Sequence, residues 1–106
     1  MIRALVDTGA SCTCVDPSVL ANLNLTPTGS VSVNTPSTGA TPHLANQYDI
    51  ALIIPPNKGV PLIFQTIPVV ASDLSAQGLQ ALIGRDILKG CLFTYNGDAD
   101  VFTLAY

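Results

Sequence analysis

The sequence Leu-Val-Asp-Thr-Gly-Ala-Ser at residues 5–11 organises the rest of the chain. Two apolar residues lead to a single acid, Asp7, and a hydroxyl residue and a glycine follow it at once. An apolar strand can hold the acid rigidly, and Gly9 allows a tight turn with backbone angles that other residues disfavour. The pattern predicts a carboxylate fixed at a sharp bend after a strand, a geometry suited to a reacting acid. A plain turn in which Asp7 bonds its own backbone also fits this stretch.

A second motif lies far downstream, where an apolar pair ends in glycine and a short helical pattern follows. It consists of Leu82, Ile83, Gly84 and Arg85. Together with the Asp-Thr-Gly-Ala stretch, this motif resembles the retropepsins, the retroviral-type aspartic peptidases. In that family the strand that carries the glycine passes through the bend after the acid. The resemblance covers most of the chain and implies a mainly β fold, a small closed-barrel domain with one or two short helices.

Length and composition exclude several other classes of protein. The chain has 106 residues, which fits a single domain over residues 1–106. Apolar residues make up 48% of the chain and charged residues only 10%, which favours burial of part of its surface in a subunit interface. The net charge of −3 argues against nucleic-acid binding, and no apolar run is long enough to span a membrane. Retropepsin domains normally carry further strands before the catalytic acid, so we expect upstream N-terminal strands to be missing here.

Hydrophobic periodicity and turn residues locate the other elements. Strands are expected at residues 2–6, 12–15, 31–34, 43–54, 60–70, 82–83, 91–95 and 101–106. Asp16 followed by Pro17 predicts the start of a short helix, because Asp caps helices and Pro suits the first helical position. A second short helix is expected at residues 85–89, and Asn96 followed by Gly97 predicts a hairpin between the last two strands.

The segment from residue 31 to residue 54 is predicted to form two strands joined by a loop of small residues. An ordinary surface hairpin fits this pattern, whereas the resemblance implies the flap that closes over the substrate. In the second case Thr38, Gly39 and Ala40 would contact the bound peptide. Ala10 and Ser11 would contact it from the side of the catalytic loop.

Ser11 departs from the family pattern. Many retropepsins have Asp at this position, and that Asp forms an ion pair with the arginine that matches Arg85. Ser11 cannot form an ion pair, so we expect Arg85 to use Asp16, Asp86 or a carbonyl group of a partner chain. The departure concerns substrate preference more than the reaction.

The chemistry implied by the resemblance needs two carboxyl groups that hold a water molecule between them and share one proton. The chain has seven Asp but a single Asp-Thr-Gly, so the second carboxyl group would come from another copy across a twofold axis. The expected protein is a homodimeric aspartic endopeptidase that acts on polypeptides, with Asp7, Thr8 and Gly9 in the catalytic site. Ala10 lacks the hydroxyl that pepsin-like enzymes often have there, which predicts activity at mildly acidic pH.

Two other functions stay open. One is a catalytically inactive retropepsin-like module for dimerisation or peptide binding, and the weaker one is a plain β-barrel binding domain. No cofactor is expected. The spacing of Cys12, Cys14, Cys91 and His43 matches no standard zinc site, so we expect buried free thiols and no metal. An odd number of cysteines slightly favours a reducing, cytoplasmic compartment.

Overall fold

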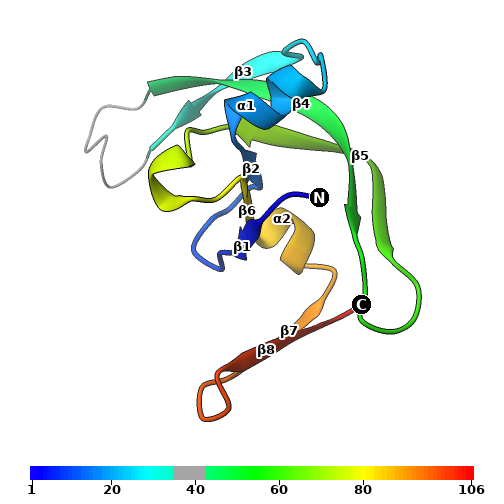
Figure 1. The fold of residues 1–106 in the computed structure, drawn as a ribbon. Helices are drawn as coiled ribbons and strands as arrows, with labels where there is room; N and C mark the ends of the chain where they lie inside the picture. The colour runs from blue at the N-terminus through cyan, green and yellow to red at the C-terminus, as the bar shows by residue number, and fades with distance from the viewer. Residues whose placement is uncertain (35–42) are drawn as a thin grey trace.

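The computed structural model describes residues 1–34 and 43–106, and it is built around one curled sheet (Figure 1). The sheet has six strands in the order β1-β6-β2-β5-β4-β3 and forms a half-barrel, and β7 and β8 form a separate two-stranded sheet. The strands are β1 (Ala4–Val6), β2 (Cys14–Val15), β3 (Gly29–Val33), β4 (His43–Ile54), β5 (Leu62–Ala71), β6 (Ala81–Ile83), β7 (Leu92–Asn96) and β8 (Val101–Ala105). The helices are α1 (Pro17–Asn22), the 3-10 helix η1 (Ser75–Gln77) and α2 (Arg85–Leu88). The mainly β fold with short helices is confirmed.

The long hairpin of β4 and β5 forms the wall of the half-barrel. Its strands pair in an antiparallel register with an irregularity between Ile50 and Leu52. β4 has the bounds expected from its alternation of apolar and polar residues, because one face of the strand packs on the core. The segment at residues 60–70, which was expected to form either a strand pair or one bent strand, forms the single strand β5. On β5, strand β2 pairs with Val70 and Ala71 alone, so Pro68 lies where that edge of β5 has no partner strand.

Helix α1 begins as the sequence predicts. The carboxylate of Asp16 accepts hydrogen bonds from the Ser18 backbone N–H at 2.9 Å and from its hydroxyl at 2.8 Å, and Pro17 occupies the first turn. The same carboxylate accepts a 2.8 Å hydrogen bond from the backbone N–H of Leu74, which precedes η1. Asp16 therefore caps a helix and also joins two segments that are far apart in the chain.

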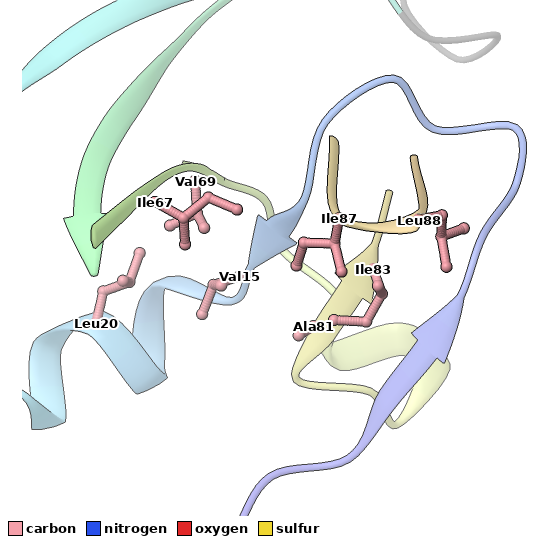
Figure 2. Close-up of a cluster of buried hydrophobic side chains, with 8 residues drawn as sticks. All are labelled: Val15, Leu20, Ile67, Val69, Ala81, Ile83, Ile87 and Leu88. Carbon is pink, nitrogen blue, oxygen red and sulfur yellow. The ribbon is translucent and has the colours of Figure 1, made fainter. Parts of the chain in front are cut away.

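The hydrophobic core lies between α1, α2 and the strands β2, β5 and β6 (Figure 2). Leu20 of α1 is only 1% exposed, and Ile87 of α2 is buried to the same extent. The cluster consists of Val15, Leu20, Ile67, Val69, Ala81, Ile83, Ile87 and Leu88. Because it combines side chains from both halves of the chain, it fixes the second motif against the first.

Strand β6 occupies the place in the sheet that matters most for the site. It runs parallel to β1, with Val6 opposite Ile83, and antiparallel to β2, with Cys14 opposite Leu82. β6 therefore lies between the two strands that the Asp-Thr-Gly loop connects.

Three expected strands or turns differ in detail. The strand expected at 12–15 begins only at Cys14, because the backbone N–H of Thr13 bonds a side chain, Asp86, at 2.9 Å instead of a neighbouring strand. The strand expected at 2–6 begins at Ala4, where its pairing with β6 begins. The last hairpin is present, but its turn covers residues 97–100, and Asp100 rather than Gly97 has a positive φ of 55°.

Candidate active site

Asp7 lies just after β1 and is half-buried. Its backbone N–H donates to the carbonyl of Ile83 at 2.9 Å, which continues the pairing of β1 with β6. One carboxylate oxygen, Oδ1, accepts a 2.9 Å hydrogen bond from the backbone N–H of Gly9, and the Asp7 carbonyl accepts one from Ala10 at 3.2 Å. The acid is therefore fixed at a bend, while within the described residues Oδ2 has no hydrogen-bond partner.

The reason for glycine at position 9 differs from the expected one. Gly9 does not have a positive φ, so its backbone angles are open to other residues. A Cβ atom there would instead lie 3.2 Å from Oδ1 of Asp7, closer than ordinary van der Waals contact. Gly9 thus leaves room for the carboxylate that its own N–H binds.

Gly84 lies where β6 crosses the loop that follows Asp7. A Cβ atom at this position would lie 2.6 Å from the carbonyl carbon and oxygen of Cys12, and 3.0 Å from the backbone nitrogen of Thr13. These contacts are with backbone, which cannot move aside as a flexible side chain can. The second motif requires glycine because the two chain segments touch there, as the resemblance implies.

Thr13 and Asp86 hold this crossing in place. Thr13 is 0% exposed, and its hydroxyl donates to Oδ1 of Asp86 at 2.7 Å while accepting from the backbone N–H of Gly84 at 3.1 Å. Oδ2 of Asp86 accepts from the Thr13 N–H at 2.9 Å, and Oδ1 also accepts from Ile87. Thr13 had no expected role in the site, and Asp86 was expected only as a possible partner of Arg85. The sequence signal for Asp86 was its position directly after Arg85, but an acid at the start of a helix explains that position equally well.

Arg85 binds the loop that follows Asp7 through carbonyl groups. Its guanidinium Nη1 donates to the carbonyl of Thr8 at 2.9 Å, and its backbone N–H donates to the carbonyl of Ala10 at 2.9 Å. The expected carboxylate partners are both engaged elsewhere, because Asp16 caps α1 and Asp86 binds Thr13. Among the described residues, Arg85 therefore binds carbonyl groups of its own chain and neither of the expected carboxylates, and a carbonyl of a partner chain stays a prediction.

The structure brings most of the predicted site residues together around one loop. Thr8, Gly9 and Ser11 are exposed, and Ala10 is half-buried. Beyond Ser11 a groove runs between the catalytic loop and strands β3, β4 and β5. Its lining residues are Ser11, Cys12, Val31, Ser32, Val33, Asn34, Gln47, Pro68, Val70 and Asp86. The predicted substrate-binding residues Thr38, Gly39 and Ala40 lie outside the described residues.

The cysteines beside the loop are half-buried free thiols. Burial raises the pKa of Cys14 to about 11, and the neighbouring Cys12 and the carboxylates of Asp86 and Asp7 add to the effect. Cys14 is therefore a thiol rather than a thiolate at neutral pH, and a poor nucleophile. In residues 1–34 and 43–106, no group of three or more His, Cys, Asp or Glu side chains is placed to hold a metal ion. Over the same ranges, no helix has the length and apolar character needed to span a membrane.

Comparison with known proteins places this geometry in a family. No curated protein sequence matches the chain. Residues 1–87 match the family model of the aspartyl proteases, and this range includes the Asp7 loop, the Gly84 crossing and Asp86. The matched part is most of the chain and ends before β7. The chain belongs to the aspartyl protease family.

Proposed function

We propose that the protein is an aspartic endopeptidase of the retropepsin type, in which a homodimer builds one active site from the Asp7 of each subunit. The observation that carries the proposal is the state of the Asp7 carboxylate. Gly9 fixes one of its oxygens, and the other has no partner among the described residues. A carboxylate held in this way on a rigid loop can bind a reacting water molecule.

A second carboxyl group is needed, and the other acids of the chain are poor candidates to provide it. Both oxygens of Asp86 bind Thr13, and both oxygens of Asp16 accept backbone N–H groups. Asp73 binds Ser75. The remaining acids are Asp49 on β4 and the pair Asp98 and Asp100 in the β7–β8 turn. A second copy of Asp7 across a twofold axis is the simplest source of the missing group.

In the proposed reaction the two Asp7 carboxyl groups share one proton, because two carboxylates within hydrogen-bonding distance of each other cannot both stay ionised. The ionised carboxylate takes a proton from the bound water, and the water oxygen attacks the scissile carbonyl carbon. The protonated carboxyl group donates its proton to the carbonyl oxygen, which gives a neutral tetrahedral intermediate. The intermediate collapses when the carboxyl group that took the water proton donates it to the peptide nitrogen, the other carboxylate takes a proton from a hydroxyl of the intermediate, and the C–N bond breaks.

The other residues of the loop have supporting roles in this proposal. Thr8 is exposed, so its hydroxyl is available to brace the loop of the second subunit. Gly9 would present its carbonyl to an extended peptide, which would bind by backbone pairing like an added strand. The groove beyond Ser11 would receive a substrate side chain, and Val31, Val33 and Val70 in its lining favour an apolar one.

The test is peptide cleavage by the purified protein in mildly acidic buffers, with and without a statine-type inhibitor. Asp7→Asn should lower kcat/KM by at least about 10³-fold, because the acid takes part in the reaction itself. Asp49→Asn, a change at an exposed acid on β4, is the matched control and should keep activity. Peptide binding without any cleavage would instead identify an inactive binding module, and cleavage that survives Asp7→Asn would refute the proposal.

A further inference from the structure

The β7–β8 hairpin forms a two-stranded sheet of its own, and Leu104 is the hairpin residue that packs on the core. It follows α2 and extends away from the six-stranded sheet (Figure 1). It also lies outside residues 1–87, the range that matches the aspartyl protease family. A two-stranded sheet by itself is marginally stable in water, so a hairpin that stands apart needs a further surface to pack against.

One face of this hairpin is apolar along its whole length. Tyr95 pairs with Phe102 and Phe93 pairs with Leu104, so these four side chains share a face. The rings of Phe93 and Phe102 lie 5.6 Å apart. Near the body of the protein the face is covered, since Phe93 and Leu104 are half-buried. Toward the turn it is open, with Tyr95 65% exposed and Phe102 54% exposed.

The base of the hairpin is basic. A hollow beside the catalytic loop is lined by Thr8, Arg85, Leu88, Lys89 and Phe93. It contains two of the four cations of the chain, and Arg85 bonds a carbonyl there rather than an acid. The hollow therefore joins the catalytic loop to the covered end of the apolar face and carries positive charge.

The tip of the hairpin is acidic. The turn between β7 and β8 carries Asp98 and Asp100, both exposed. A strand rises about 3.3 Å per residue, so the five residues of β7 separate tip from base by roughly 17 Å. Each hairpin thus has an acidic end and a basic end, joined by an apolar face.

We infer that this hairpin docks on the hairpin of a second copy of the chain, in an antiparallel twofold arrangement. A twofold axis across the apolar face places the tip of each hairpin at the base of the other. Tyr95 and Phe102 of one copy are then covered by the partner. Asp98 and Asp100 face Arg85 and Lys89 of the partner subunit. The inference deepens the proposed function, since the basic hollow includes Thr8 and the docking brings the two Asp7 loops toward a common axis.

The test uses two charge variants and sedimentation equilibrium. The base variant is Lys89→Glu. The tip variant combines Asp98→Lys with Asp100→Asn, since Asn tolerates the positive φ of 55° at position 100. Each variant alone should dimerise about tenfold more weakly than wild type at low salt, because an attractive contact is lost twice per dimer. An equimolar mixture should regain dimerisation, since in the mixed dimer the unchanged tip meets the unchanged base and the side chains introduced at positions 89 and 98 have opposite charges.

A second pair of variants tests the apolar face. Tyr95→Ser with Phe102→Ser should weaken the dimer by about 30-fold or more, the usual effect of losing central aromatic contacts. The matched control is Ile53→Ser with Ile63→Ser, a cross-strand pair on β4 and β5 that is also exposed. This control should leave the dimer unchanged, and far-UV circular dichroism should confirm that every variant folds.

Three outcomes would overturn the inference: a wild-type monomer at all concentrations, hairpin variants that dimerise like wild type, or a mixture that recovers nothing. Failure of the proposed function gives a different result. If the hairpin variants weaken the dimer but no peptide is cleaved, the hairpin interface is supported and the proposed peptidase activity is refuted. If peptides are cleaved and the hairpin variants leave the dimer unchanged, the peptidase activity is supported and the hairpin interface is refuted.

Discussion

The Asp7 loop and the β7–β8 hairpin show two different ways in which this chain uses its residues. The loop lies on both sides of β6, and its conformation is fixed by hydrogen bonds that Gly84 and Arg85 donate and that the Asp86 carboxylate accepts. The hairpin is fixed mainly by its own ladder and leaves Tyr95 and Phe102 open to solvent. A single chain therefore positions the Asp7 carboxylate by itself, whereas the hairpin offers a surface whose packing the single chain leaves incomplete.

The largest expected difference between the loop and the hairpin is the loss of stability when a glycine in each is replaced by alanine. Gly84→Ala should lower the free energy of unfolding by about 3 kcal/mol or more, because the new Cβ would lie 2.6 Å from the Cys12 backbone. Gly97→Ala in the hairpin would meet only the ring of Tyr95, at 3.3 Å, and that ring can shift. Urea unfolding of both variants measures the difference. Equal losses would show that the crossing at Gly84 is not tight.

Replacing one threonine beside the Asp7 loop and one in the hairpin compares how much their hydroxyl groups contribute to stability. Thr13→Val keeps the side-chain shape but leaves Oδ1 of Asp86 and the N–H of Gly84 without the hydroxyl, which should cost about 2 kcal/mol. Thr94→Val on the exposed face of β7 should change stability by less than about 0.5 kcal/mol. Thermal unfolding compares the two variants. If the proposed function holds, Thr13→Val should also lower kcat, since it loosens the loop of Asp7.

The hydrogen bonds of Asp16 make the stability of the fold depend on pH in the acid range. The N–H groups of Leu74 and Ser18 and the Ser18 hydroxyl lower the pKa of Asp16 below its ordinary value of 3.8. A lowered pKa means that this contribution to stability is present above the unfolded value and is lost as pH falls through the folded value. Asp16→Asn keeps a good N-cap but removes the charge. Its Tm should be lower than that of wild type at neutral pH, and the gap should close as pH falls from about 5 toward 2. A constant gap would contradict this assignment.

The smallest predicted effect concerns Ala10, beside the reacting acid, and it rests on the proposed function. A hydroxyl at this position would donate to an ionised carboxylate and favour that form. Ala10→Ser should therefore move the acid limb of the pH–rate profile to lower pH, with little change in the maximal rate. The profile of kcat/KM on one peptide substrate measures the shift. An unmoved acid limb would show that Ala10 does not set the pH range.

Much of the fold followed from local signals. The bounds of β4 came from its alternation, and the start of α1 came from Asp16 and Pro17, because these signals depend on neighbours in the chain. The partners of Arg85 did not follow, because its two candidate carboxylates are taken by Thr13 and by the cap of α1. Several distant donors can bind the same carboxylate, and the residues next to it in the sequence do not show which of them does.

The amino-acid sequence alone pointed to Asp7 as the candidate acid and to Gly9 and Gly84 as the glycines around it. The Asp-Thr-Gly stretch and the later Leu-Ile-Gly-Arg stretch are sufficient for that, because the two motifs in this order resemble those of one peptidase family. Only the tertiary structure decided why those glycines are needed and what holds them. Gly9 makes room for a carboxylate oxygen and Gly84 for a crossing backbone, and Thr13 with Asp86 closes the crossing. The physical reason is that close packing between segments more than 70 positions apart depends on how the whole chain folds.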